Sequence, residues 1–369
     1  MSTQHPAREF AFDIGPVRVA PATALAPMEG ITDKGFRALI RGMGGCGLTV
    51  TEFVSSDLMS RNVASAWRLA ELPEDEHPVS IQIYGRDPEK MAQAAEYCEQ
   101  LGADVVDLNL GCPSKAVTSG CSGSALMKEP ELARRMFAAV KAAVSIPMTV
   151  KMRLGWDTDR LNAPEIAWMA QEEGADMVVV HGRTRMQMYR GSADWAAVRA
   201  TKARLRIPVL VNGDILTVDD AVAALAASGA DGVMVGRGAM RDPWILRKIA
   251  DHFAGRVPYE PPLMDRRDTL LKYFGMLEAE AQTDRRAVGR MKKVTGYFTR
   301  GLPYGTELRE TIYHSFTPEA IRDAVHGYFE RLQAEGVADG FTRIHEAEVT
   351  DHTSGDSRNL TREAECCVQ

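Results

Sequence analysis

Short apolar runs alternate with helix-like segments over residues 22–255, and this alternation constrains the fold more than any other feature. The runs are mostly continuously apolar, as strands covered on both faces are. The segments between them, such as 87–103 and 217–230, open with an Asp or Thr cap and close with Gly. We expect eight strands, at residues 22–28, 48–54, 79–84, 105–110, 147–152, 177–182, 208–213 and 232–236.

Eight such strands with eight helices favour an α/β fold of the (β/α)8 TIM-barrel type, which takes about 250 residues. A doubly wound open sheet is the competing interpretation of the same alternation. A doubly wound nucleotide-binding fold should show G-x-G-x-x-G after its first strand, whereas "APMEGIT" follows here. We therefore expect the barrel.

The alternation of strand-like and helix-like segments stops after residue 255. A Pro-rich stretch, "RVPYEPPLMD", leads into a helical pattern without a convincing strand. The last residues are polar and rich in Ser, Thr and charge. We expect a barrel domain at residues 1–255, a C-terminal helical domain at 256–337 and a disordered tail at 338–369.

Composition excludes several classes of protein. No apolar run approaches the roughly 20 residues needed to cross a bilayer, and the N-terminus lacks a signal sequence, so we expect a cytoplasmic protein without a membrane partner. The six cysteines of the 369 residues form no C-x-x-C pair, which predicts free thiols and no metal site. The formal charge of −6 means that a polyanion would have to bind a local basic surface.

The active site of such a barrel lies at the C-terminal ends of its strands. The seventh and eighth strands end in "NGD" and "VGRG", where barrels commonly hold a phosphate with Gly N–H groups, and Arg237 could add a charged contact. Tight turns are the alternative explanation. The predicted ring of strand-end residues is Pro27, Met28, Gln82, Asn109, Cys112, Lys151, Arg153, His181, Arg183, Asn212, Asp214, Gly236 and Arg237.

Two residues of this ring suit a flavin. Gln82 can both donate and accept hydrogen bonds, and Lys151 brings a cation that would stabilise the negative charge of a reduced flavin. Taken singly, Lys151 is more typical of a surface salt bridge, and His181 of a satisfied core histidine.

A basic segment interrupts the acidic chain at 285–306. It holds six basic residues and no acidic one, with three aromatic residues interleaved. Arg286, Arg290, Lys293 and Tyr297 are spaced by four, three and four, which places them on one helical face. A solvated face is the alternative, but this composition favours binding of an RNA backbone.

The order of motifs resembles the tRNA-dihydrouridine synthase family of the bacterial type. The resemblance covers about residues 24–332 and includes "RMKKVTGYF", which is similar to that family's tRNA-binding helix. The motifs are "APMEGITD", "IQIYG", "DLNLGCPSKAV" followed after five residues by "GSAL", "VKMRLGW", "VVHGRTRMQMYRG", "NGDI" and "VGRGA".

The resemblance implies an enzyme that reduces the C5–C6 double bond of uracil in tRNA, usually in the D-loop, with a tightly bound FMN and with NADPH as reductant. Hydride from reduced flavin N5 would go to C6, and Cys112, set between Gly111 and Pro113, would give a proton to C5. A thiol with an ordinary pKa of about 8.5 is mostly protonated, as a general acid must be.

Other roles are implied position by position. Asn109, Arg153, Arg183 and Tyr189 would contact the uracil and its phosphates, and Arg286, Arg290 and Lys293 the tRNA. Residues 1–255 would then be the catalytic domain and 256–337 the tRNA-binding domain. The implied FMN shell is Pro27, Met28, Glu29, Gln82, Lys151, His181, Asn212, Gly213, Asp214, Gly236 and Arg237.

Two other hypotheses compete with the synthase. A small-molecule flavin oxidoreductase of the dihydroorotate dehydrogenase or old-yellow-enzyme kind would share the phosphate site but would not use a basic helical domain. A non-catalytic tRNA-binding protein would not need Cys112.

Overall fold

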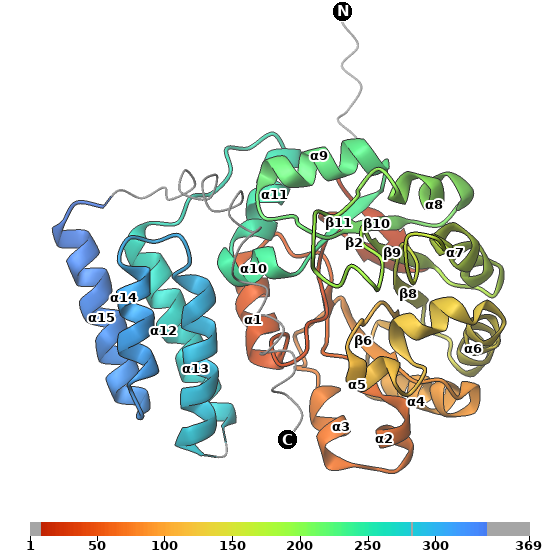
Figure 1. Ribbon diagram of the computed structural model, residues 1–369, viewed down its shortest axis with the longest axis horizontal. Helices are drawn as coiled ribbons and strands as arrows, with labels where there is room; N and C mark the ends of the chain where they lie inside the picture. The colour runs from red at the N-terminus through yellow and green to blue at the C-terminus, as the bar shows by residue number, and fades with distance from the viewer. Residues whose placement is uncertain (1–8, 282, 338–369) are drawn as a thin grey trace, which may run out of the picture. The chain divides into compact units, whose positions relative to one another are not determined.

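Eight parallel strands form the central barrel in the computed structural model, which describes residues 9–281 and 283–337 (Figure 1). Seven pairings run in the order β3-β11-β10-β9-β8-β7-β6-β4. A bridge between Ala24 of β3 and Leu48, the residue before β4, closes the ring. The barrel strands are β3 (Thr23–Leu25), β4 (Thr49–Val50), β6 (Val79–Tyr84), β7 (Val105–Leu110), β8 (Met148–Arg153), β9 (Met177–His181), β10 (Val209–Asn212) and β11 (Gly232–Val235).

This arrangement confirms the predicted TIM barrel and excludes the open sheet. The predicted second strand, 48–54, is wrong in extent, because it divides into β4 and a separate β5 (Val54–Ser55) that pairs with the far end of β6. Glu52 lies between the two, and its carboxylate accepts a hydrogen bond from the backbone N–H of Gly30. The chain therefore leaves the ring after two residues.

Helices follow the strands and cover the outside of the barrel (Figure 1). The Asp87 carboxylate caps α4, and Thr217 and Asp220 form a reciprocal capping box at the start of α9, which ends at Gly229 with φ 68°. The helices of this part are α1 (Lys34–Met43), α2 (Ser56–Ser60), α3 (Ala64–Leu69), α4 (Pro88–Gln100), α5 (Lys115–Thr118), the 3-10 helix η1 (Gly123–Lys128), α6 (Pro130–Ala143), α7 (Ala163–Glu172), α8 (Val198–Arg204), α9 (Val218–Ser228), α10 (Arg237–Arg241) and α11 (Ile245–Phe253).

An antiparallel hairpin, β1 (Phe12–Ile14) and β2 (Val17–Val19), closes the N-terminal end of the barrel. Phe12, Ile14 and Val19 are buried in one apolar cluster with residues from six of the eight barrel strands. This hairpin was absent from the predicted elements. Its burial fills the end of the barrel that faces away from the strand-end ring.

A buried ion pair ties α1 to the loop that precedes β6. The Arg37 guanidinium donates to both carboxylate oxygens of Glu76, at 2.7 and 2.9 Å, and the Thr49 hydroxyl donates to the same carboxylate. Both charged side chains are almost fully buried. Such a pair is costly to break from one side only.

The described chain forms two compact units, 9–239 with 245–258, and 240–244 with 259–337. The second unit is helical, with Leu270, Phe274, Leu277, Ile321 and Phe329 among its buried residues. The predicted tail, 338–369, lies outside the described residues. The helices of this unit are α12 (Leu263–Glu280), α13 (Asp284–Phe298), α14 (Gly305–Tyr313) and α15 (Pro318–Ala334).

No helix in the described ranges is long and apolar enough to span a membrane.

Candidate active site

The barrel interior changes from apolar to polar along each strand. Side chains two residues apart share a face of a strand, so the inward residues of β7 are Val105, Asp107 and Asn109. Val105 belongs to the apolar cluster at the hairpin end, whereas Asn109 lies near the C-terminal end of the strand. The same change runs through Met177, Val179 and His181 on β9 and through Leu210 and Asn212 on β10. The predicted ring residues thus gather at one end.

Three strands share a chain of side-chain hydrogen bonds at this end. The Thr149 hydroxyl donates to Asp107 Oδ1 at 2.6 Å, and Gln82 Nε2 donates to Asp107 Oδ2 at 2.5 Å. Asn109 Nδ2 donates to Gln82 Oε1 at 2.7 Å. Asn109 Oδ1 in turn accepts from the backbone N–H groups of Gly111 and Cys112 at 3.0 and 2.8 Å. The chain ends at the backbone of Cys112.

The Cys112 thiol lies on a loop that folds back on itself, since Ser124 bonds to the Cys112 backbone. The Ser124 N–H and hydroxyl both donate to the Cys112 carbonyl oxygen, at 3.1 and 2.8 Å. Gly123 has φ 58°, and a Cβ there would lie 3.0 Å from that same oxygen, so the turn requires glycine. Burial raises the pKa of Cys112 to about 11. The thiol is therefore protonated at neutral pH.

Lys151 lies on β8 opposite Asn109 of β7. Its ammonium makes no hydrogen bond or ion pair with the residues that the structure describes. Burial, together with the charge of Arg153, lowers its pKa to about 8. A partly buried cation without a partner is a group that an anionic or hydrogen-bond-accepting ligand would satisfy.

His181 is buried beside these cations. Burial, then the charges of Arg153, Lys151, Arg183 and Arg237, lower its pKa well below its ordinary value. The imidazole is therefore neutral at pH 7. His181 Nε2 lies 3.5 Å from Arg183 Nη1, which can only donate, so Nε2 is the acceptor and Nδ1 carries the N–H of the neutral ring.

Backbone donors are available after β10 and β11. The N–H groups of Gly213, Gly236 and Arg237 donate no hydrogen bond within residues 9–281 and 283–337. Gly213 has φ 112°, and a Cβ there would lie 2.7 Å from His181 Cδ2. Asn212 Nδ2 donates to the Met234 carbonyl at 2.8 Å and braces the two strand ends. This donor set suits a phosphate, as expected from "NGD" and "VGRG".

Asp214 is already engaged by two arginines. Arg183 donates to both of its carboxylate oxygens, at 2.9 and 2.5 Å, and Arg237 donates to Oδ1 at 2.7 Å. Burial raises the pKa of Asp214, but the hydrogen bonds and charge of Arg183 outweigh burial and hold the pKa below its ordinary value. Asp214 thus orients the Arg237 guanidinium, and its own contact with a cofactor stays a prediction.

Arg153 and Arg183 are 1% and 2% exposed and hold the loop that follows β9. Arg153 donates to the carbonyls of Gly111, Thr184 and Met188, at 2.8 to 2.9 Å. Arg183 donates to the carbonyls of Arg190 and Gly191. The structure therefore uses both guanidinium groups within the protein, and their predicted contact with substrate stays a prediction.

Tyr189, on that loop, is 49% exposed. The guanidinium carbons of Arg153 and Arg237 lie 5.6 and 5.0 Å from the centre of its ring. Such cation–π contacts hold an aromatic face in place without covering it completely. The exposed ring is available to a planar ligand.

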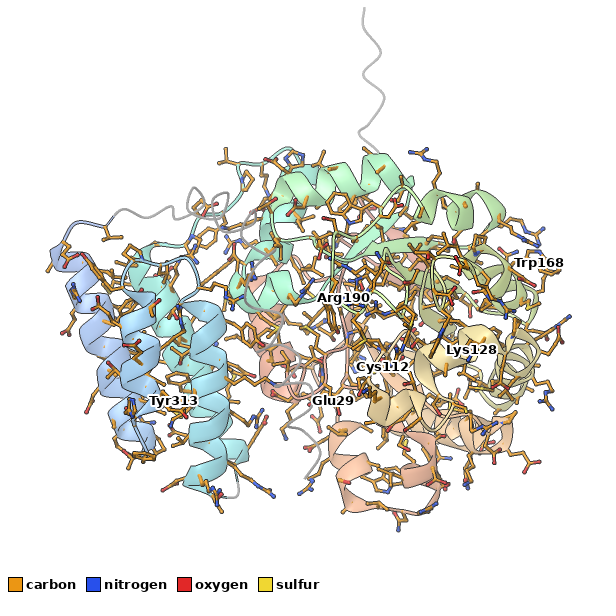
Figure 2. The ribbon with its side chains drawn as sticks, in the orientation of Figure 1. Glu29, Cys112, Lys128, Trp168, Arg190 and Tyr313 are labelled. Atoms are coloured by element: carbon orange, nitrogen blue, oxygen red, sulfur yellow. The ribbon has the colours of Figure 1, made fainter. Side chains whose placement is uncertain are left out.

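The loop after β3 completes the ring. The Met28 N–H donates to the Thr32 hydroxyl at 2.9 Å, and a Cβ on Gly236 would lie 3.4 Å from Met28 Sδ. Pro27 and Met28 are partly exposed, and Glu29 is exposed. In Figure 2, Cys112 lies between the labelled Glu29 and Lys128.

The predicted basic face lies on α13 of the helical unit. Arg286 is exposed, and Lys293 and Arg290 are partly exposed. Arg290 has an acidic partner outside the basic segment 285–306, because its Nη1 lies 3.2 Å from Oε2 of Glu280 in α12. The opposite face of α13 buries Val288, Met291 and Phe298 among others.

Sequence reasoning missed Asp107, which is 2% exposed. A charged residue inside the apolar run "VVDLNL" was the available signal. No group of three or more His, Cys, Asp or Glu side chains that could hold a metal ion occurs in the described part of the chain.

Comparisons with known proteins agree on one family. A family model described as dihydrouridine synthase matches residues 24–333. The chain is 40% identical over 322 residues to "tRNA-dihydrouridine synthase B" of Xanthomonas axonopodis pv. citri, covering 87% of this chain and 96% of that protein. It is 39% identical over 319 residues to "Probable tRNA-dihydrouridine synthase" of Rickettsia conorii, covering 86% and 96%.

A solved structure of a 2-naphthoyl-CoA reductase complex is similar in fold. The match has a TM-score of 0.51 at 15% identity and covers 67% of this chain and 52% of that chain. This likeness shows the barrel alone.

Proposed function

This chain belongs to the dihydrouridine synthase family and is an enzyme, and from that premise we propose that it reduces the C5–C6 double bond of uridines in tRNA to 5,6-dihydrouridine. FMN is the proposed cofactor and NADPH the proposed reductant. The observation that carries the proposal is a partly buried, protonated thiol, Cys112, at the same barrel end as an ammonium and backbone N–H groups that have no partner among the described residues.

The residues present fit FMN. The free N–H groups of Gly213, Gly236 and Arg237 suit its phosphate, together with the Arg237 guanidinium that Asp214 orients. After its contacts with Asp107 and Asn109, the Gln82 amide keeps one N–H donor and one oxygen lone pair. These suit the pyrimidine edge of a flavin, which has both hydrogen-bond donors and acceptors. The Lys151 ammonium would satisfy the flavin's developing negative charge.

Cys112 is the proposed general acid. Its raised pKa keeps the proton on Sγ until a carbanion-like C5 develops, and the thiolate left behind is reprotonated from water. When bound and reduced, FMN supplies a hydride for C6. Because His181 is neutral at pH 7, it offers no imidazolium proton in competition with the thiol.

A uridine inside folded tRNA must leave its stack to reach this end of the barrel, at a cost of a few kcal/mol. The exposed Tyr189 ring offers a stacking face for the extruded base. Arg286 and Lys293 of α13 are the proposed contacts with the tRNA backbone, with the D-loop as the expected target. A tRNA substrate also agrees with the expected cytoplasmic location.

The test is anaerobic mixing of NADPH-reduced protein with unmodified tRNA or free uridine, followed by analysis of the RNA. The proposal expects flavin bands that reoxidise rapidly with tRNA and slowly with uridine, and dihydrouridine in the product. Cys112→Ala should bind tRNA and flavin but lose turnover, while Cys121→Ala serves as the matched control. A yellow protein indifferent to tRNA would point to the small-molecule oxidoreductase, and a colourless protein that FMN cannot reconstitute would remove both flavin functions.

A further inference from the structure

Asp107 is a buried carboxylate in the middle of a central strand. It is flanked in register by Gln82 of β6 and Thr149 of β8, and it accepts a hydrogen bond from each. Burying a carboxylate among apolar residues is unfavourable unless its hydrogen bonds are strong. Thr149 and Gln82 supply such bonds. An apolar side chain at position 107 would fill the same space without any need for hydrogen bonds, so stability alone does not explain the carboxylate.

The direction of every hydrogen bond beyond Asp107 is determined. The backbone N–H groups of Gly111 and Cys112 can only donate, so the atom of Asn109 that faces them must be its oxygen. Asn109 therefore turns its NH2 to Gln82, which must present its own oxygen there. Gln82 is left with its NH2 facing Asp107, and only an acceptor can satisfy that group.

We propose that Asp107 is a positioning residue, whose carboxylate holds the Gln82 and Asn109 side chains in place and so supports the backbone of the Cys112 loop. That Asp107 matters for turnover rests on the proposed function. The structural basis of the inference is the chain of hydrogen bonds from Asp107 through Gln82 and Asn109 to the Cys112 N–H, which we call the Asp107 relay. Asp107 touches no reacting atom and acts through Gln82 and Asn109.

An apolar residue at 107 should release the relay. Without an acceptor at position 107, the Gln82 NH2 keeps one buried N–H unsatisfied, which favours displacement of the Gln82 side chain. Asn109 Nδ2 then loses its acceptor on Gln82. The Asn109 side chain is held less firmly against the N–H groups of Gly111 and Cys112, and the loop that carries the thiol becomes more accessible.

The measurement is the rate of alkylation of Cys112 by iodoacetamide in the flavin-bound protein, followed by mass analysis of the peptide that contains Cys112. Asp107→Leu should raise this rate about tenfold, the effect of losing one or two net hydrogen bonds. Asp107→Asn should stay within about twofold of wild type, because its oxygen can still accept from Gln82 while the Thr149 hydroxyl turns to accept from its NH2. Thr149→Val is the matched control, since it removes a buried hydrogen bond to Asp107 but leaves the relay intact.

Equal rates in Asp107→Leu and Thr149→Val would overturn the proposal, as would an equally large increase in Asp107→Asn. If Asp107→Leu does not fold, Gln82→Met cuts the relay one step later and must show the same increase; a wild-type rate there also overturns it. Alkylation needs no tRNA, so a protein that fails to reduce tRNA but shows this pattern would lose the proposed function and keep the relay.

Discussion

Lys151→Met should make the flavin-free protein more stable at neutral pH. The fall in the pKa of Lys151 from its ordinary 10.5 to about 8 corresponds to up to about 3 kcal/mol by which folding disfavours the charged amine. Methionine has a similar length and no charge, so the variant avoids this cost. Flavin affinity should fall in the same variant, because the cofactor's acceptor loses its cation.

The sign of the pH dependence follows from linkage. Below pH 8 the amine is charged in both the folded and the unfolded chain, and the full cost is present. Between about 8 and 10.5 the unfolded chain binds more protons, so the stability of the wild type rises with pH relative to the variant. The advantage of Lys151→Met should therefore vanish by about pH 10.5.

The assay is urea unfolding of both flavin-free proteins at several pH values from 7 to above 10, with other titrating groups cancelling in the difference. Lys141→Met is the control, since Lys141 is paired with Asp176 at 3.0 Å and its replacement should give no stabilisation. A variant that is no more stable than wild type at pH 7, or a difference that stays constant across the range, would refute the reasoning.

Three further outcomes are expected. Cys112→Ala should lower single-turnover reduction of tRNA about 10²- to 10⁴-fold, and the wild-type rate should show no loss assigned to Cys112 until the pH nears its pKa of about 11, as a stopped-flow pH profile would reveal. Glu76→Gln should destabilise the protein by about 3 to 5 kcal/mol in urea unfolding, because it leaves the Arg37 charge buried without its counter-ion. Arg286→Glu with Lys293→Glu should weaken tRNA binding and make the dependence of log affinity on log salt shallower by about 0.7 to 0.9 per lost phosphate contact; an unchanged slope would remove α13 from the interface.

The barrel could be predicted because its strands carry a strong local signal. β6 and β7 match the predicted ranges, 79–84 and 105–110, since both are rich in β-branched and other apolar residues and bounded by turn residues. The second strand was wrong in extent because pairing decides where a strand ends. After Val50 the chain leaves the sheet and rejoins β6 only at Val54, which no local pattern encodes.

The sequence predicted which residues lie at the strand ends of the candidate site, but not which hydrogen bonds join them. Strand ends identified Gln82, Asn109 and Lys151, because parallel strands bring their C-terminal ends together. The partners of those residues depend on register between strands, which is why Asp107 was overlooked. The substrate contact of Arg183 was implied by the resemblance alone and stays a prediction. The sequence pattern did not show that Arg183 also donates to Asp214 and to loop carbonyls, because these partners depend on three-dimensional proximity.

The hairpin of β1 and β2 has a consequence for synthesis on the ribosome. Phe12, Ile14 and Val19 are translated well before two of their packing partners, Leu210 and Met234, which follow some two hundred residues later. This apolar segment therefore has no complete burial place until the eighth strand has left the exit tunnel. Contacts of such long sequence separation form late, and the exposed segment is a natural binding site for chaperones during that delay.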